Sequence, residues 1–304
     1  MSKFIYLKTI SELFKLFGLG NNIAHPLVAV VDFAKVSGHV SNGVKISAEF
    51  YSVMFKNSSN NNIRYGRTPF DFQNGSLICM APGQVIEMDN ELDESSENMP
   101  GWGLFFHPDL IRNTSLNDKI QAYTFFSYEM SESLHLSEKE KQVLYDCVLK
   151  IEAELQENID VHSRDILVST IELLLNHCSR FYGRQFITRK NSNNAVLVQV
   201  ERLLSAYYKR QDLSARGLPT VKSLAAQVYL SPGYLSDLLK KETGKNAQDH
   251  IHFYLIEEAK SLLLSTNKSV GEIAYFLGFE YPQYFNRLFK QKTGKTPIAF
   301  RSMN

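Results

Sequence analysis

The last hundred residues contain one segment twice, and this internal repeat limits the possible folds more than any other feature of the chain. Residues 231–245 read SPGYLSDLLKKETGK, and residues 281–295, fifty positions later, read YPQYFNRLFKQKTGK. A tyrosine, a lysine and the Thr-Gly-Lys end recur in register. A short apolar helical pattern and a tight turn precede each copy, with these apolar residues: Leu224, Ala225 and Val228, then Ile273, Ala274 and Leu277. Each repeat therefore predicts a helix-turn-helix.

Composition and cysteine usage set the outer limits. The 304 residues, 44% of them hydrophobic, suffice for two domains with their own cores. Cys79, Cys147 and Cys178 form no CxxC pair, which is typical of core residues in a reducing compartment and argues against a cysteine-based metal site. No apolar run reaches the roughly eighteen residues of a membrane helix. Residues 1–20 carry charges at helical spacing, so we expect an amphipathic helix there and a cytoplasmic protein.

Charge is divided unevenly along the chain. Residues 1–183 contain 15 lysines and arginines against 23 acids, a net charge of −8, whereas residues 195–304 contain 15 against 9, a net charge of +6. A basic carboxyl-terminal part beside an acidic amino-terminal part is expected when only the former binds nucleic acid. Many basic surfaces bind nothing, so charge alone leaves both interpretations open.

The amino-terminal part has the pattern of a small β-barrel or sandwich. β-Branched and aromatic residues cluster in short runs, at residues 27–36, 44–55, 70–72, 76–80 and 101–106. Asn74-Gly75 predicts a hairpin turn, and Pro108 can begin a short helix after the last strand. Six acids without a base between Glu87 and Glu97 indicate a mobile, solvated loop rather than a metal site.

Two longer helices and a polar segment follow. Ser137 and Glu140 form a capping box, which predicts a helix from there to about residue 158. A second helix, from about 163 to 182, has an apolar stripe that fits either packing within its own domain or a dimer interface. The stripe consists of Ile166, Ile171, Leu174, Leu175 and Cys178. Residues 184–194 are polar and basic, so we expect the interdomain linker there.

The apolar positions of each repeat determine which residues face outward. Ser231 and Pro232 begin the first helix, which runs to about Thr243. The inward positions are Leu235, Leu238 and Leu239, and Phe285, Leu288 and Phe289. The outward positions are Gly233, Ser236, Asp237 and Lys240, and Gln283, Asn286, Arg287 and Lys290. Arginine can pair with guanine, asparagine and glutamine with adenine, and lysine with phosphate, so these faces predict a DNA-reading surface. In isolation, Asn286 and Arg287 would be read as ordinary solvated residues.

The segment between the repeats supplies an independent check. Residues 247–265 predict one helix with a common apolar face, made of Ile251, Leu255, Ala259, Leu262 and Leu263. Nineteen residues at about 1.5 Å each span about 28 Å, near the ~34 Å of one duplex turn. One chain could therefore place two recognition helices in successive major grooves.

These features match a known family. Residues 195–304 resemble the DNA-binding domain of AraC/XylS transcription regulators, whose second unit has a signature seen here as Ala274, Gly278-Phe279, Tyr284-Phe285, Phe289-Lys290, Gly294, Pro297 and Phe300-Arg301. The amino-terminal part is similar to their sensor half in His25-Pro26-Leu27, Phe70-Asp71-Phe72, Ala81-Pro82-Gly83-Gln84 and Phe106-His107-Pro108-Asp109.

The resemblance implies an α+β multidomain protein. Its parts would be a cupin-like β-barrel sensor domain with an N-terminal helix (1–134), a helical dimerisation segment (135–183), the linker (184–194) and an all-α domain with two helix-turn-helix units joined by a long helix (195–304). The implied function is a transcription regulator that binds promoter or operator DNA as a homodimer. A small-molecule effector and RNA polymerase are further candidate partners; no membrane, metal or cofactor is expected. The effector, the operator and the choice between activation and repression stay open.

The resemblance also assigns base contacts. They are Gly233, Ser236 and Asp237 in the first recognition helix and Pro282, Gln283, Asn286 and Arg287 in the second. Asp237 stands where larger or basic side chains are common; it can accept from cytosine but is repelled by phosphate. We therefore expect the second unit to discriminate more between bases. Tyr229 fills a turn position held by Gly278 in the second copy, which predicts strain in the first unit. Phosphate contacts are expected from Lys240, Lys241, Lys290, Lys292 and Lys295.

The alternative function is a cupin-type metal-dependent enzyme fused to a DNA-binding domain. Such enzymes hold a metal between histidines and a carboxylate, but only His250 and His252 are closely spaced, and both lie in the helix between the repeats. No nucleophile elbow, P-loop or HExxH motif occurs, so we expect no enzyme. The polar side chains most suited to an effector accompany the predicted strands: His25, Arg64, Tyr65, Arg67 and Trp102.

Overall fold

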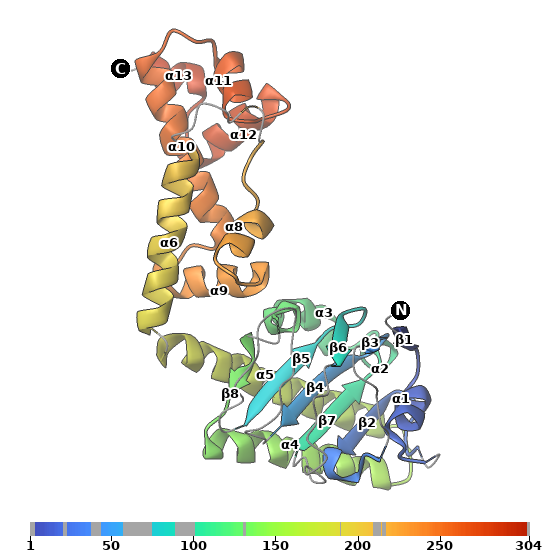
Figure 1. The fold of residues 1–304 in the computed structure, drawn as a ribbon. Helices are drawn as coiled ribbons and strands as arrows, with labels where there is room; N and C mark the ends of the chain where they lie inside the picture. The colour runs from blue at the N-terminus through green and yellow to red at the C-terminus, as the bar shows by residue number, and fades with distance from the viewer. Residues whose placement is uncertain are drawn as a thin grey trace. The chain divides into compact units, whose positions relative to one another are not determined.

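A computed structural model of the chain describes residues 4–20, 23–37, 44–56, 75–88, 101–129, 132–188, 190–208, 214 and 217–302 (Figure 1). The chain separates into two compact units, Met1–Thr188 and Arg189–Asn304. The division falls inside the segment 184–194 that was expected to be the linker. That segment is helical on both sides, because α5 (Ser163–Thr188) ends the first unit and α6 (Lys190–Tyr208) begins the second. Among the described helices, none is long and apolar enough to cross a membrane.

The strands of the first unit form two sheets. Their bounds are β1 Phe4–Leu7, β2 Val28–Asp32, β3 Val44–Ala48, β4 Tyr51–Lys56, β5 Ser76–Met80, β6 Val85–Met88, β7 Gly101–Phe106 and β8 Leu134–His135. The smaller sheet has the order β1-β3-β6, and the larger has the order β2-β7-β4-β5-β8. Only β1 and β3 pair in parallel among these described strands. Since the described strands form two sheets, the closed cupin-like barrel stays a prediction.

The helix expected over residues 1–20 is wrong for its first part. Phe4–Leu7 form β1, which pairs with β3 along its whole length. The helix α1 spans only Ile10–Phe17, because Thr9 caps it: the Thr9 hydroxyl accepts from the Glu12 N–H at 3.2 Å, and the Glu12 carboxylate accepts from the Thr9 N–H in return. Strand pairing thus overrides the helical spacing of the charges in the first residues.

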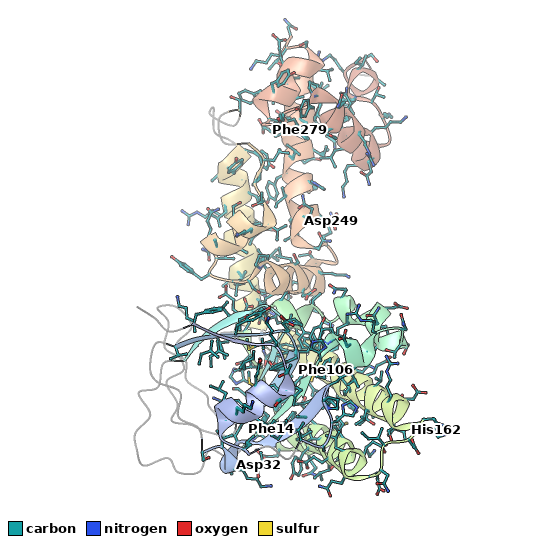
Figure 2. All side chains as sticks on the ribbon, turned by 90° about the vertical axis from the view of Figure 1, so that its right-hand side faces the viewer. Phe14, Asp32, Phe106, His162, Asp249 and Phe279 are labelled. Carbon is teal, nitrogen blue, oxygen red and sulfur yellow. The ribbon has the colours of Figure 1, made fainter. Side chains whose placement is uncertain are left out.

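An apolar core lies between the two sheets and α1. Leu7, Ile10, Val31 and Ile46 are buried in it together with Phe105 of β7. Side chains alternate along a strand, so the neighbours of Phe105 face the opposite side of the larger sheet. On that side Phe106, labelled in Figure 2, stacks on the Tyr51 ring, and α4 and α5 pack against the sheet edges at β2 and β8 (Figure 1).

The helices of the first unit follow the sequence prediction except at the end of α5, which continues to Thr188 instead of ending at about residue 182. The Ser137–Glu140 capping box is confirmed at the start of α4 (Glu138–Gln156), and Pro108 begins α2 (Pro108–Ile111). The other short elements are α3 Ser115–Lys119, η1 Phe33–Lys35, η2 Ile120–Ala122 and η3 Thr124–Ser127. In α5, four of the five stripe residues are fully buried within the unit, whereas Ile166 is 46% exposed. The stripe therefore packs mainly in its own domain.

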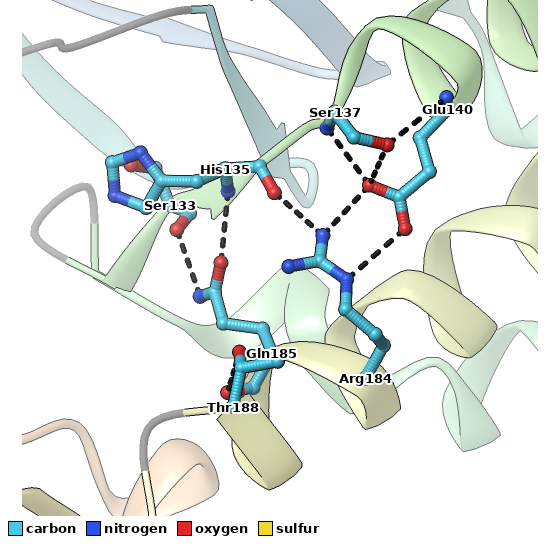
Figure 3. Close-up of polar contacts among 7 residues, drawn as sticks. All are labelled: Ser133, His135, Ser137, Glu140, Arg184, Gln185 and Thr188. Carbon is cyan, nitrogen blue, oxygen red and sulfur yellow. Dashed lines mark hydrogen bonds and ion pairs between the residues drawn. The ribbon is translucent and has the colours of Figure 1, made fainter.

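Polar contacts fix the last turns of α5 to β8 and to the start of α4 (Figure 3). Arg184 forms a two-point ion pair with Glu140, from Nε to Oε1 at 3.0 Å and from Nη2 to Oε2 at 2.8 Å. The same Nη2 donates to the His135 carbonyl at 2.7 Å. The buried Gln185 amide accepts from the His135 N–H at 2.8 Å and donates to the Ser133 carbonyl at 3.1 Å, as a neighbouring strand would. The helix that leads out of the first unit is therefore held tightly by its own domain.

The described secondary-structure elements of the second unit are all helices. After α6 come α8 Val221–Gln227, α9 Pro232–Thr243, α10 Ala247–Ser265, α11 Val270–Phe276, α12 Pro282–Thr293 and α13 Pro297–Arg301. The predicted bounds of α9 and α10 are confirmed. In Figure 1, α10 runs along the unit with α8 and α9 beside its first part and α11 to α13 around its last part.

Candidate nucleic-acid interface

The first helix-turn-helix consists of α8 and α9. Ser231 caps α9, because its hydroxyl accepts from the Tyr234 N–H at 3.2 Å, and Pro232 occupies the first helical position, which needs no N–H. Leu235, Leu238 and Leu239 are buried as predicted. The opposite face of α9 is therefore the one available to a partner.

The second helix-turn-helix consists of α11 and α12. Phe285 and Phe289 are fully buried and their rings lie 5.7 Å apart, which confirms two of the three predicted inward positions; Leu288 is half-buried. Tyr281 precedes α12 and makes no side-chain cap. Ser269 and Glu272 form a capping box at the start of α11, so this unit is secured at its first helix instead.

Both recognition helices end in the same way. Gly244 and Gly294 have φ of 76° and 77°, the left-handed conformation in which glycine is favoured, so the predicted C-caps are confirmed. The hydroxyls of Thr243 and Thr293 each donate to the carbonyl four residues earlier at 2.8 Å. The threonine and glycine of the repeated Thr-Gly-Lys motif therefore form a helix-termination signal.

The turns of the two units share a backbone shape but not a residue type. Tyr229 has φ of 57°, and Gly278, in the equivalent place, has φ of 93°. Tyr229 is also 89% exposed, so no packing within the described residues offsets the steric cost of this conformation. A Cβ atom on Gly278 would lie 2.8 Å from the Gly217 backbone. The first turn is therefore strained, as predicted, whereas the second requires glycine for two reasons.

The outward faces of the two recognition helices differ in reach. Gln283, Asn286 and Arg287 are exposed on α12, each with a long or amide side chain, and Pro282 is half-buried. On α9 the assigned positions Gly233, Ser236 and Asp237 are all half-buried and short. The second helix therefore presents more hydrogen-bonding groups to a partner.

The lysines expected at phosphates are all exposed: Lys240, Lys241, Lys290, Lys292 and Lys295. Lys292 also donates from Nζ to Asp249 Oδ1 of α10 at 2.9 Å. This hydrogen bond holds the pKa of the Asp249 carboxyl below its usual value. Lys292 thus has a partner inside its own unit.

Helices α6 and α10 tie the two helix-turn-helix units together. Tyr208 at the end of α6 is buried in the same core as Phe279, Phe285 and Phe289 of the second unit; Figure 2 labels Phe279. The neighbouring Tyr207 hydroxyl donates to the Gly217 carbonyl at 2.6 Å, just before α8. The spacing of the recognition helices is therefore fixed by two connections and not by α10 alone.

The candidate effector residues are not brought together where the structure describes them. Arg64, Tyr65 and Arg67 lie outside the described residues. His25 precedes β2, and its Nδ1 accepts from the Leu27 N–H at 3.1 Å, whereas Trp102 pairs with Asp32 at the other end of β2. The Trp102 ring lies 6.0 Å from that of Phe55, away from the core between the sheets. No shared site for His25 and Trp102 emerges.

Sequence patterns missed several contacts made by side chains of the long helices. His250 is buried, and its Nε2 lies 2.9 Å from the Thr243 hydroxyl at the end of α9. Asn193 of α6 donates to Glu242 of α9 at 3.0 Å. Such contacts join helices whose relative placement the sequence does not reveal. Among the described residues, no group of three histidine, cysteine or acidic side chains could hold a metal.

Comparison with known proteins agrees with this geometry. A family model described as a helix-turn-helix domain matches residues 224–303. The chain is 39% identical over 85 residues to the bifunctional transcriptional activator/DNA repair enzyme AdaA of Bacillus subtilis, covering 28% of this chain and 40% of that one. It is 31% identical over 128 residues to the HTH-type transcriptional regulator YijO of Escherichia coli, 42% of each. It is 30% identical over 118 residues to the xylose operon regulatory protein of Escherichia coli, 39% of this chain and 30% of that one.

The carboxyl-terminal unit is therefore a helix-turn-helix domain. Its duplicated motif resembles that of the AraC/XylS type, and the relatives that it matches are named as transcription regulators. The chain spans well under two thirds of the length of these relatives, between 30% and 42%.

Proposed function

We propose that this chain is a sequence-specific DNA-binding transcription regulator of the AraC type, which inserts α9 and α12 into successive major grooves. The carrying observation is the pair of helix-turn-helix units joined by α10, a helix of 19 residues. At about 1.5 Å per residue this helix is about 28 Å long, which suits grooves one duplex turn apart on one face of DNA.

Base reading is assigned mainly to α12. Gln283 and Asn286 can pair with adenine, and Arg287 with guanine. Gly233, Ser236 and Asp237 of α9 carry less hydrogen-bonding reach, and Asp237 is repelled by phosphate. The exposed Lys240, Lys241, Lys290 and Lys295 would attract phosphates. The first helix-turn-helix would then position the protein on DNA, while the second helix-turn-helix discriminates between bases.

The amino-terminal unit is proposed to be a cupin-like sensor domain that controls DNA binding through an effector or through dimerisation. Arg184 and Gln185 hold the end of α5 to β8, so a change in the sheet could reach the chain that enters the second unit. We expect stabilisation of the full chain by one member of a metabolite library in a thermal-shift assay. No shift with any compound would contradict effector control.

A homodimer is proposed to form through residues 135–183. Apolar side chains remain exposed at helical spacing on α4 and α5: Tyr145, Leu149, Ile166 and Leu173. We expect the double variant Leu149→Glu and Leu173→Glu to sediment as a monomer, because charges would interrupt an apolar interface. Val161→Glu, in the exposed turn between these helices, is the matched control and should leave the dimer intact. A dimer that survives the double variant would exclude this surface.

The proposal makes the chain a regulator that acts on DNA in the cytoplasm, with RNA polymerase as a candidate partner, and not an enzyme. The test is selection of duplexes bound by the full chain from a random pool. We expect enriched sequences with two conserved segments about 10 base pairs apart. Their affinity should fall steeply with salt, since lysines replace counterions at phosphates. Absence of any enriched sequence would contradict the proposed function.

A further inference from the structure

One helical position anchors each proposed recognition helix to the long helix that precedes it. Glu242 is the eleventh residue of α9, and Lys292 is the eleventh residue of α12; each helix has 12 residues. Glu242 accepts a hydrogen bond from Asn193 of α6 at 3.0 Å. Lys292 donates to Asp249 of α10 at 2.9 Å. The contact is thus repeated in the two units, although the side chains that make it are chemically different.

The position lies on the inner flank of the recognition helix. At about 100° per residue, Lys292 is about 180° around α12 from Gln283 and about 140° from Arg287. Lys290, by contrast, is within about 20° of Gln283. A groove that receives Gln283 and Arg287 would therefore meet Lys290 but not Lys292.

The surroundings of the two contacts fit a docking role. Asn193 is buried, so its amide is held in place by packing. The Lys292 and Asp249 side chains are 35% and 38% exposed, and Asp249, labelled in Figure 2, stands in the first turn of α10, where a helix favours negative charge. Lys292 stands in the last turn of α12, where positive charge is favoured. The charges of Asp249 and Lys292 are therefore each favourable at the end of their own helix, in addition to attracting each other.

We propose that Lys292 and Glu242 are positioning residues, which set the angle of each recognition helix against α10 and α6, and that Lys292 is not a phosphate ligand. This inference rests on the proposed function, since it concerns how the reading helices are aimed. It changes the assignment made from sequence, in which Lys292 was grouped with the phosphate-binding lysines.

Removing the Asp249 carboxylate separates the two roles by the sign of the effect. If Lys292 contacted phosphate, Asp249→Ala would remove a negative charge, release the lysine and tighten DNA binding. If Lys292 positions α12, Asp249→Ala weakens binding, because no side-chain oxygen is left to accept from Lys292. Because a half-exposed pair contributes little, we expect a loss of about two- to fivefold on the selected duplex, with the salt dependence unchanged. Tighter binding by Asp249→Ala would overturn the proposal.

The partner variants complete the cycle. Lys292→Met should weaken binding by a similar factor, the double variant should be no weaker than either single one, and Lys292→Arg should bind as the parent does, since a guanidinium can also pair with Asp249. Lys290→Met is the matched control: as a phosphate contact, its loss should lower the slope of log affinity against log salt by about 0.9. A slope lowered by Lys292→Met to the same extent would contradict the assignment.

The first helix-turn-helix allows the same kind of test, in which a charge effect and a positioning effect change DNA affinity in opposite directions. Glu242→Ala removes a negative charge from a DNA-binding helix, which would strengthen binding if only charge mattered. We expect weaker binding, because α9 loses its bond to Asn193, and we expect Glu242→Gln to bind as the parent does, since its amide oxygen can still accept. Stronger DNA binding by Glu242→Ala would contradict the assignment of Glu242 as a positioning residue of α9.

A second measurement keeps this inference distinct from the proposed function. Hydrogen exchange of the DNA-free full chain should show faster exchange of the amides in residues 289–293 in both Asp249→Ala and Lys292→Met, because the last turn of α12 loses its anchor. Faster exchange without any DNA binding would contradict the proposed function alone. Unchanged exchange in both variants would overturn the docking contact itself.

Discussion

The two helix-turn-helix units share a scaffold and differ in what they expose. Both recognition helices have 12 residues, begin at a proline and end at a left-handed glycine. Yet the repeated tyrosine is buried as Tyr234 in the first and 56% exposed as Tyr284 in the second, and Asp237 stands where Arg287 does. Duplication has therefore kept the signals that start and stop helices, while the faces that meet a partner have separated in chemistry.

The largest expected difference lies in the cores. Phe289 is fully buried between Phe285 and Phe300, with ring centroids 5.7 Å and 5.5 Å away, whereas Leu239 fills the equivalent place in α9. We expect Phe289→Ala to lower the free energy of unfolding of the second unit by about 3–5 kcal/mol and Leu239→Ala to cost less. Urea denaturation of the full chain, with hydrogen exchange to assign each transition, measures both. A larger loss from Leu239→Ala would reverse this ranking.

The turns should respond in opposite directions. Gly278→Ala combines a left-handed conformation with a clash against Gly217, so we expect a loss of about 2 kcal/mol or more in stability. Tyr229→Gly relieves the same conformation in the first unit and should raise stability by roughly 0.5–1 kcal/mol. Thermal unfolding of both variants checks the pair; destabilisation by Tyr229→Gly would mean that the exposed ring makes a contact that compensates the strain.

The outward faces of the two recognition helices also differ in the sign of their charge at one equivalent position. We expect Arg287→Ala to weaken binding to a selected duplex by about 1–3 kcal/mol and to relax one base preference. Asp237→Ala, at the equivalent position of α9, should leave affinity unchanged or raise it, because an acid near phosphates is lost. Fluorescence anisotropy titrations at one salt concentration compare the two. Equal losses would indicate that both helices read bases.

The helix starts provide a smaller contrast. Ser231→Ala should cost about 1 kcal/mol, since the Tyr234 N–H loses its cap. Tyr281→Ser should supply the missing cap on α12 and stabilise the second unit by several tenths of a kcal/mol. Urea denaturation of the parent and of each variant measures both changes in the free energy of unfolding. No gain from Tyr281→Ser would show that the Tyr281–Tyr284 ring contact already compensates for the missing cap.

Low pH should reduce the stability of the first helix-turn-helix more than that of the second, because a histidine occupies one repeated position only in the first. Burial lowers the pKa of His250, which contacts Thr243 of α9, whereas Phe300 holds the equivalent place in the second unit. A lowered histidine pKa means that the unfolded chain binds the proton more readily, so stability is lost as pH falls below the unfolded value near 6.5. His250→Phe should reduce this loss. An unchanged pH dependence of unfolding would assign the effect to other histidines.

Much of the carboxyl-terminal unit follows from local chemistry. Ser231 and Pro232 determine where α9 begins, and Gly244 determines where it ends, so the sequence predicts its bounds. The face of each helix follows from the spacing of its apolar residues. Lys292 shows the limit of this reasoning: its side chain reads as basic and solvated, and only the packing of α12 on α10 reveals Asp249 beside it.

The amino-terminal unit is harder to predict because strand pairing is not local. Nothing near Phe4–Leu7 indicates that these residues pair with β3, forty positions later. Trp102 suited an effector site by residue type, but the register of β7 against β2 and β4 turns it toward Phe55 and away from the core between the sheets. A one-residue change in register would have reversed that orientation.

The central claim is that the first helix-turn-helix, α8 and α9, positions the protein while the second, α11 and α12, reads bases. One measurement tests it directly. It is the dissociation constant of the full chain on its selected duplex and on every single-base variant of it. We predict that substitutions in one segment cost about 1–3 kcal/mol each, that those about 10 base pairs away cost clearly less, and that Arg287→Ala flattens the costly segment only. Equal costs in both segments, or a profile that Arg287→Ala leaves unchanged, would contradict the account.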